Sequence, residues 1–262
     1  MNPGNRMIGG LLIAALFLGG AMPLCADEAL DKAFDALKTY DWGDNREALK
    51  PIDDAVVAAG KDAEAAKAIE AKLSAVLGED IPQAAKDFVC RKLSLVGTAT
   101  SVPALAKLLP DEKLSHMARY ALERMPCDEA LQAMREALGN TSGLVKVGIV
   151  NSLGARRDKA AVDELSKLLA DSDKQVAAAA AAALGSIGTV EAAKSLEGFL
   201  GSAPEPLKND AAHAYLLCAD RLLADGNRMQ ALLIYRALAA ADVPRHIKVA
   251  ATRGMLSATG KQ

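Results

Sequence analysis

The apolar positions of this chain recur at the spacing of an α-helix. Leu105, Leu108 and Leu109 stand three and four residues apart, and the same spacing returns in the stretch 165–169. Residues with this spacing share one face of a helix. Beyond the N-terminal segment, no stretch alternates apolar and polar residues with the period of two that predicts a half-buried strand. The pattern therefore predicts a succession of amphipathic helices.

The predicted helices come in pairs at a nearly constant interval. The stretch LSLVGTATSVPALAKLL at 93–109 matches LGSIGTVEAAKSLEGFL at 184–200, each running from one helix through Gly-Thr into the next. A leucine near the end of each second helix recurs at steps of 29, 31, 31 and 32 residues, at Leu93, Leu122, Leu153, Leu184 and Leu216. Similarity at such a period is typical of solenoids. We expect an all-α fold, an α-solenoid (superhelix) of stacked antiparallel helix pairs of about 31 residues.

The turns within the pairs carry capping residues. Asp111 in LLPDEK and Asp171 in LLADSD are suited to capping the helix that follows. A glycine near the end of the second helix is expected to close that helix in a left-handed conformation in several units. The unit from 127 to 153 has MREALGNTSG where the Leu-Leu-Asp turn is expected. A longer or irregular turn is predicted there.

Seven consecutive alanines occupy one of the second helices, in KQVAAAAAAALGSIG at 174–188. The run is either low-complexity filler or a helix whose neighbours lie too close for longer side chains. Alanine has the highest helix propensity and permits the short end of the usual 8–10 Å between helix axes. Leu184 and Gly188 keep the repeat register, which favours close packing.

These motifs carry a family resemblance. The order apolar-x-x-Leu-Leu, Asp turn, Ala-x-x-Ala-Leu-Gly is similar to HEAT repeats, in particular the short bacterial repeats also found in phycobilisome-lyase proteins. SHMARYALERMP and NSLGARRD resemble their signatures, and ALDKAFDALKTYDWGDNREALKPID resembles the helical lead-in of exported bacterial HEAT-repeat proteins. DGNRMQALLIYRALAAADVP, with Ala231, Tyr235 and Leu238, resembles the second helix of a tetratricopeptide repeat. The expected segments are a signal peptide at 1–26, an N-terminal helical cap at 27–61, HEAT-like repeats at 62–220, and tetratricopeptide-like helices with a cap at 221–262.

The N-terminus has the order of a secretory signal. Arg6 precedes an apolar run from Ile8, and PLCA then offers cleavage after Ala26. We expect export, with the mature chain periplasmic or extracellular. A retained membrane anchor is the alternative. Lipidation at Cys25 is a lesser one, because Leu24 precedes the cysteine where lipoprotein signals have a small residue.

Charge and cysteine content exclude further classes. Loss of the signal removes Arg6 and leaves 30 basic and 33 acidic residues, a net charge of −3 that offers no basic stripe for nucleic acid. Cys90, Cys127 and Cys218 would remain. Their odd number and wide spacing argue against a disulfide framework. We interpret them as small buried apolar residues.

The sequence shows no constellation of catalytic residues. The three histidines fall in different repeats without the spacing of metal ligands, and phosphate loops, serine elbows and Cys-x-x-Cys pairs are missing. We therefore expect no enzyme, no metal and no cofactor. Arg156 and Arg157 form a basic turn that could hold an anionic partner. Trp42 is expected to close the open N-terminal edge of the core.

The outward face of the second helices is the predicted binding surface. Helical geometry selects the positions two and six residues before each repeated leucine. Two before are Arg91, Tyr120, Asn151, Ala182 and Ala214; six before are Asp87, His116, Val147, Ala178 and Asp210. Charged, aromatic and amide groups gather in the first three repeats, so we expect partner contacts at Asp87, Arg91, His116, Tyr120 and Asn151. The alternative is that these are ordinary solvated residues.

Two functions are compatible with this sequence. The first is an exported, non-catalytic scaffold that binds another exported or membrane-associated protein, by analogy with repeat proteins in general. It would touch the membrane only if the signal segment were retained. The second follows from the resemblance to lyase-associated repeats: an accessory or lyase-like protein that binds a haem or tetrapyrrole group at Arg91, His116 and Tyr120.

Overall fold

The computed structural model describes residues 22–260, and all regular structure in that part of the chain is helical. The helices are α1 (Met22–Leu37), α2 (Lys50–Ala59), α3 (Ala63–Val76), α4 (Gln83–Val96), α5 (Val102–Ala106), α6 (Ser115–Leu122), α7 (Asp128–Leu138), α8 (Gly143–Ala155), α9 (Val162–Leu168), α10 (Lys174–Ile187), α11 (Val190–Ser202), α12 (Leu207–Ala224), α13 (Arg228–Ala240) and α14 (Arg245–Thr259), with 3₁₀ turns η1 (Arg46–Leu49) and η2 (Lys159–Ala161). Most of the predicted signal peptide lies outside the described residues. None of the described helices has the length and apolar character needed to cross a membrane.

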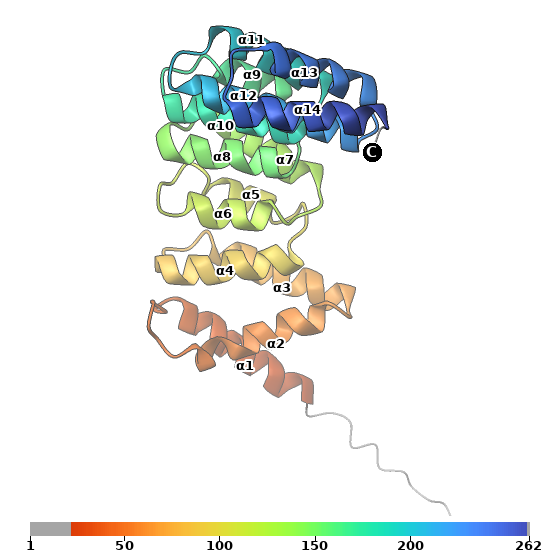
Figure 1. Ribbon diagram of the computed structural model, residues 1–262. Coiled ribbons are helices and arrows are strands. Elements are labelled where there is room, and N and C mark those ends of the chain that lie inside the picture. Colours follow the sequence, from red (N-terminus) through yellow and green to blue (C-terminus); the bar gives the residue numbers. More distant parts are fainter. Residues whose placement is uncertain (1–21, 261–262) are drawn as a thin grey trace, which may run out of the picture.

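Successive helix pairs stack from α1 and α2 at one end to α13 and α14 at the other (Figure 1). The second helices α4, α6, α8, α10 and α12 lie side by side, each in contact with the next. The predicted all-α solenoid is confirmed. The predicted boundary between 220 and 221 falls inside α12, so that helix is shared by the central repeats and the C-terminal pairs.

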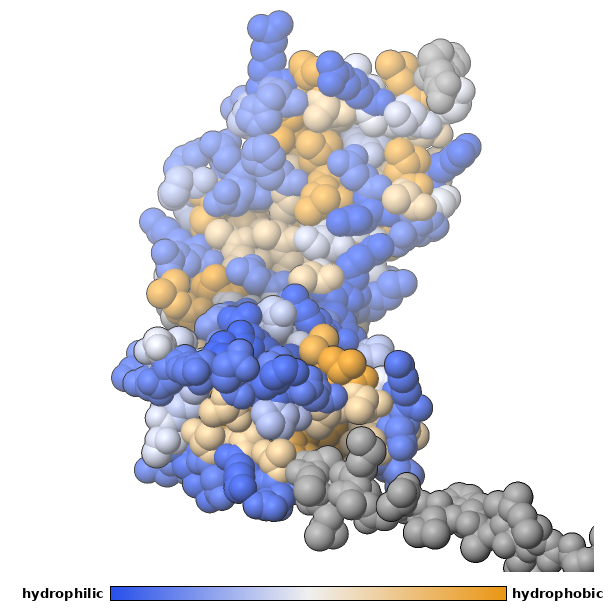
Figure 2. Space-filling view, turned by 90° about the horizontal axis from the view of Figure 1, so that it is seen from below, coloured by the Kyte–Doolittle hydropathy of each residue, from blue (hydrophilic) through white to orange (hydrophobic). Residues whose placement is uncertain are grey.

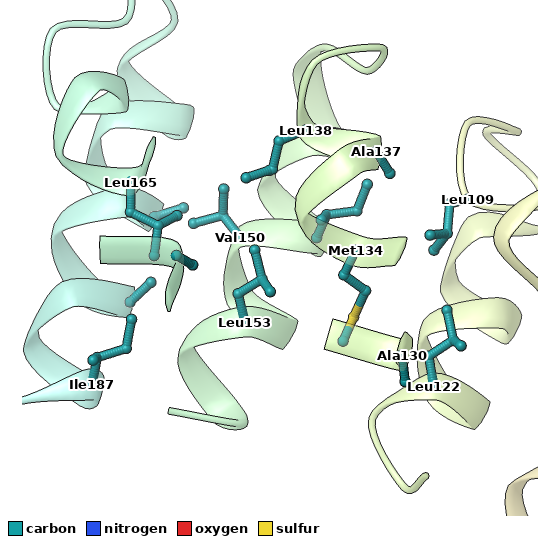
Figure 3. Packing of buried hydrophobic residues seen from close by; sticks show 14 of the residues in the cluster. Leu109, Leu122, Ala130, Met134, Ala137, Leu138, Val150, Leu153, Leu165 and Ile187 are labelled. Carbon is teal, nitrogen blue, oxygen red and sulfur yellow. The ribbon is translucent and has the colours of Figure 1, made fainter. Parts of the chain in front are cut away.

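Leucines of the second helices form the continuous core. Leu93, Leu122, Leu153 and Leu184 are fully buried. Figure 3 shows Leu122 and Leu153 among the apolar side chains that fill the space between neighbouring units. The fifth repeated leucine was misplaced: Leu216 is only partly buried, whereas Tyr215, 31 residues after Leu184, lies in the core.

The alanine run is packed between two helices at very short range. A Cβ atom at Gly154 of α8 would lie 2.8 Å from the Cα of Ala183 in α10. A Cβ at Gly185 of α10 would lie 2.5 Å from the carbonyl oxygen of Ala214 in α12. These approaches leave no room for longer side chains, so the close-packing interpretation of the run is confirmed.

The left-handed helix ends are fewer than expected. Gly188 ends α10 with φ of 69°, as predicted, but Gly97 at the end of α4 has φ of −67°. After α8, the left-handed residue is Arg157, with φ of 52°, 31 residues before Gly188. A non-glycine residue in this conformation is uncommon. The contacts of its side chain are described below.

Of the two aspartates predicted to cap second helices, one has the expected role and the other does not. Asp111 Oδ1 accepts hydrogen bonds from the backbone N–H groups of Lys113 and Leu114 at 2.8 and 3.0 Å, just before α6. The cap of α10 is Asp173, which accepts from Gln175 N, rather than Asp171. The turn at 139–142 before α8 is shorter than that at 107–114 before α6. Of the two predicted alternatives, a longer turn was wrong, because the helical run of α7 continues to Leu138. The backbone is irregular there, since Gly143 has a positive φ of 52°.

The prediction for Trp42 was also wrong. Its side chain is 60% exposed, in the turn between α1 and η1. Asp41 holds this turn: its side chain accepts from Trp42 N, and its own N–H donates to Asp44. The N-terminal end of the core is filled instead by aliphatic side chains that include Leu37 and Leu49, both fully buried.

Small-residue packing predicts opposite effects for two helical glycines. Gly185→Ala should lower the free energy of unfolding by about 1–3 kcal/mol, because the new methyl group meets the backbone of Ala214. Gly198→Ala is the matched control at an exposed position of α11, where an added Cβ meets no atom within 4 Å. It should raise that free energy by about 0.5–1 kcal/mol. Urea unfolding of both variants tests this; equal effects would contradict the close approach of α10 and α12.

The cysteine interpretation is confirmed for two of three residues. Cys90 and Cys218 are buried, and burial raises the pKa of each thiol to about 12. Cys127 is partly exposed at the start of α7.

Alkylation should distinguish these thiols. The thiolate is the reactive form, so iodoacetamide at pH 8 should modify Cys127 well before Cys90 and Cys218 in the folded protein. Unfolding in urea should bring all three thiols to similar alkylation rates. Peptide mass spectrometry measures the alkylation; rapid modification of folded Cys90 would refute its burial.

The same burial predicts a pH dependence of stability. Because the pKa values of Cys90 and Cys218 are raised in the folded state, these thiols ionise first in the unfolded chain, above pH 9. The free energy of unfolding should therefore fall as the pH rises from 9 toward 12.

Candidate partner-binding surface

The outward sides of α4, α6, α8, α10 and α12 form one surface, here called the second-helix face. The positions that the sequence selected lie on it with graded exposure. Arg91, His116 and Asn151 are exposed, and Asp87 and Tyr120 are partly buried. The alanine helix contributes Ala178 and Ala182.

Three of the predicted residues form a cluster across α4 and α6. Arg91 Nε donates to Asp87 Oδ2 at 2.9 Å, and the Arg91 guanidinium lies 5.5 Å from the centre of the Tyr120 ring. Arg124 lies 3.6 Å from the same ring and donates to the carbonyl oxygen of Tyr120. The hydrogen bond donated by Arg91 to the Asp87 carboxylate raises the pKa of Arg91. The Tyr120 ring therefore makes cation–π contacts with two guanidinium groups, those of Arg91 and Arg124.

The other two predicted residues, His116 and Asn151, lie on the same face outside this cluster. His116 precedes Tyr120 by four residues on α6 and so lies on the same side of that helix. Asn151 on α8 borders a hollow of about 540 Å³ over the alanine helix. We call this the alanine hollow; its lining includes Asn151, Ala178, Ala182, Asp210, His213 and Leu217. It exists because the part of α10 that lines it, Ala178, Ala179 and Ala182, carries only methyl groups, between longer side chains of α8 and α12.

His213 was missed as a member of this face. Counting from Leu216 placed Ala214 on the surface, but Ala214 is 4% exposed and His213 is exposed. A constant step of 31 residues from Leu184 leads to Tyr215, and two residues before it stands His213. The polar groups of the face are therefore present on both sides of the alanine helix, not only toward the N-terminal repeats.

Beneath the surface, polar groups join α6 to α8. Arg119 Nη1 donates to Ser152 Oγ at 3.1 Å, and Ser152 Oγ donates to Glu123 Oε1. Gly148 leaves space for the Arg119 side chain, since a Cβ at Gly148 would lie 2.7 Å from the Arg119 guanidinium. Burial lowers the pKa of Arg119. These contacts fix the helices that present Tyr120 and Asn151.

The basic turn after α8 is engaged within the protein. Arg156 Nη1 donates to the carbonyl oxygens of Leu122, Glu123 and Met125, at 3.1, 3.1 and 2.6 Å, at the end of α6. Arg157 donates to Ile187 O at the end of α10 and to Asp225 at 2.6 Å. Cations are favoured at the C-terminal ends of helices. One turn thus braces the preceding and the following repeat, which explains both arginines without an anionic partner.

A second hollow lies at the N-terminal end of the stack. It has a volume of about 630 Å³ between α1, α2 and α3, and its lining is mainly apolar: Ala29, Leu30, Ala55, Ala58, Ala65, Ala68 and Ile69. Figure 2, a view from this end, shows apolar side chains gathered among hydrophilic ones. Its lining offers little polar chemistry for specific recognition.

Comparison with known proteins supports part of the sequence interpretation. Residues 136–215 match the family of HEAT repeats, which covers the end of α7, α8 to α11 and the first half of α12. No curated protein has a sequence that matches this chain significantly.

Three solved structures are similar to this chain at low identity. One engineered protein is 20% identical over 89% of this chain and 69% of its own, with a TM-score of 0.42. A second is 20% identical over 80% and 97%, with a TM-score of 0.40. Human deoxyhypusine hydroxylase in complex with glycerol is 15% identical over 91% and 98%, with a TM-score of 0.38. The family match and the stacked pairs together describe a helical repeat protein whose central repeats are similar to HEAT repeats.

Proposed function

We propose that this protein is a non-catalytic scaffold that binds another protein on the second-helix face. The observation that carries the proposal is the position of the Tyr120 cluster and the alanine hollow on one row of adjacent helices. Five helices at 8–10 Å spacing extend over about 40 Å. A strip of that length is large enough for a standard interface of about 800 Å² per partner.

The residue types on this face favour protein recognition. Tyrosine and arginine are enriched among the residues that dominate binding energy, and Tyr120 with Arg91 and Arg124 provides both. The alanine hollow can receive one bulky side chain of a partner, with Asn151 and Asp210 at its margin for hydrogen bonds. The proposed partner therefore presents an acidic group toward α6 and an apolar side chain toward α10.

We propose that this function is carried out outside the cytoplasm. The signal predicted at 1–26 supports export, with the protein periplasmic or extracellular after cleavage near Ala26. The partner is then another exported or membrane-associated protein. The haem or tetrapyrrole alternative stays a prediction of the sequence, and absorbance of the purified protein after incubation with haem would test it.

Affinity purification from the exported fraction tests the scaffold proposal. A variant that combines Arg91→Ala, His116→Ala, Tyr120→Ala and Asn151→Ala should lose the partner retained by the parent chain, with binding weakened at least about tenfold. Ala182→Trp should have the same effect by filling the alanine hollow, since Ala182 is exposed and its replacement leaves the core intact.

The matched control alters the first helices of the same units. Lys107→Ala, Gln132→Ala and Glu164→Ala replace exposed residues away from the second-helix face. This control should bind like the parent. Equal retention of the partner by all variants would show that another surface binds it, and loss only in the control would assign binding to the first helices.

A further inference from the structure

Two histidines from different helix pairs face each other at the C-terminal end. His213 lies on α12 and His246 on α14, and their Nε2 atoms are 3.1 Å apart. The ring centres are separated by 5.0 Å with an angle of 31° between the planes. Both side chains are exposed. Two imidazole Nε2 atoms thus face each other at a place that solvent can reach.

The surrounding helices hold this arrangement in place. Ile247 and Ala251 bury one side of α14, next to His246. Gly254 of α14 packs on the ring of Tyr235, where a Cβ would lie 2.4 Å from a ring carbon. The Tyr235 hydroxyl donates to Asp220 of α12 at 2.6 Å. Tyr235 of α13 therefore contacts both α12 and α14, the two helices that carry the histidine pair.

We propose that His213 and His246 bind a divalent transition-metal ion of the zinc, nickel and copper class. Imidazole nitrogen binds such ions at about 2.0–2.1 Å. At that distance, two nitrogens 3.1 Å apart subtend an angle of about 95–100° at the ion. This is a normal angle between neighbouring ligands. Each imidazole binds through Nε2 and carries its hydrogen at Nδ1, so the hydrogen bond between the rings is replaced by the ion.

The charges around the pair define the kind of site. Within residues 22–260, no group of three or more ligating side chains surrounds a common point, so water completes the coordination. Asp210 lines the alanine hollow with His213. A further hollow is lined by His246 together with Asp220, Arg245 and Arg253. Nitrogen ligands disfavour Mg²⁺ and Ca²⁺, which prefer oxygen.

A bound ion would connect α14 to α12 directly. These helices are otherwise joined mainly through α13, with which both pack. The ion would close the C-terminal end of the stack beside the alanine hollow. This inference stands on the histidine geometry and is independent of the proposed scaffold function.

Calorimetric titration with Ni²⁺ and Zn²⁺ at pH 7.5 tests the site, on the full chain carrying an affinity tag without histidines. We expect one ion per chain, and affinity at least about tenfold lower in His213→Ala and in His246→Ala. His116→Ala is the matched control, because it removes the remaining exposed histidine from α6 and should bind like the parent. Zn²⁺ should also raise the melting temperature of the parent and of His116→Ala only.

Two results would overturn the site. The first is an absence of saturable binding by the parent chain at millimolar metal. The second is unchanged affinity in the double variant His213→Ala with His246→Ala, which would assign the ion to other ligands such as the Cys127 thiol. Circular dichroism of each variant verifies that it is folded. Mg²⁺, which prefers oxygen ligands, should not bind.

Discussion

The architecture depends on the near contact between the backbones of α8, α10 and α12. Gly154 against Ala183 and Gly185 against Ala214 permit an approach that any larger side chain would block. Since interiors are close-packed, this contact also fixes how far each helix can slide along its neighbour. In the sequence, this constraint corresponds to the constant step of 31 residues between the buried residues Leu153, Leu184 and Tyr215.

The same constraint shapes the surface. The alanine run of α10 also faces outward, at Ala178 and Ala182, so the alanine hollow lies between the polar margins of α8 and α12. The braces beside it, from Arg156 and Arg157, hold the helix ends of three consecutive repeats. Stiff neighbours then present Tyr120, Asn151 and His213 in a fixed order. The packing of these helices and the surface proposed to bind a partner thus depend on the same small residues.

Much of the fold could be predicted because period and side-chain size report local packing directly. The predictions failed where a tertiary contact decides. Its residue type predicts that Trp42 is buried, but the turn held by Asp41 leaves its side chain exposed to solvent. Leu216 and Tyr215 are neighbours that can each fill a core position, and only the register against α10 shows which is buried. The Arg91 and Tyr120 pair followed from helical geometry, whereas the contact of His213 with His246 depends on the pose of α14, which the repeat pattern does not cover.

Native-state hydrogen exchange tests the central claim, that the α8–α10–α12 contact is the most constrained part of the stack. Amide groups in helices that open only with global unfolding exchange slowest. The account predicts that the amides of 177–183 in α10 exchange at the global rate, more slowly than those of α1 and α14 at the two ends. Exchange of the alanine helix as fast as that of the terminal helices would contradict it.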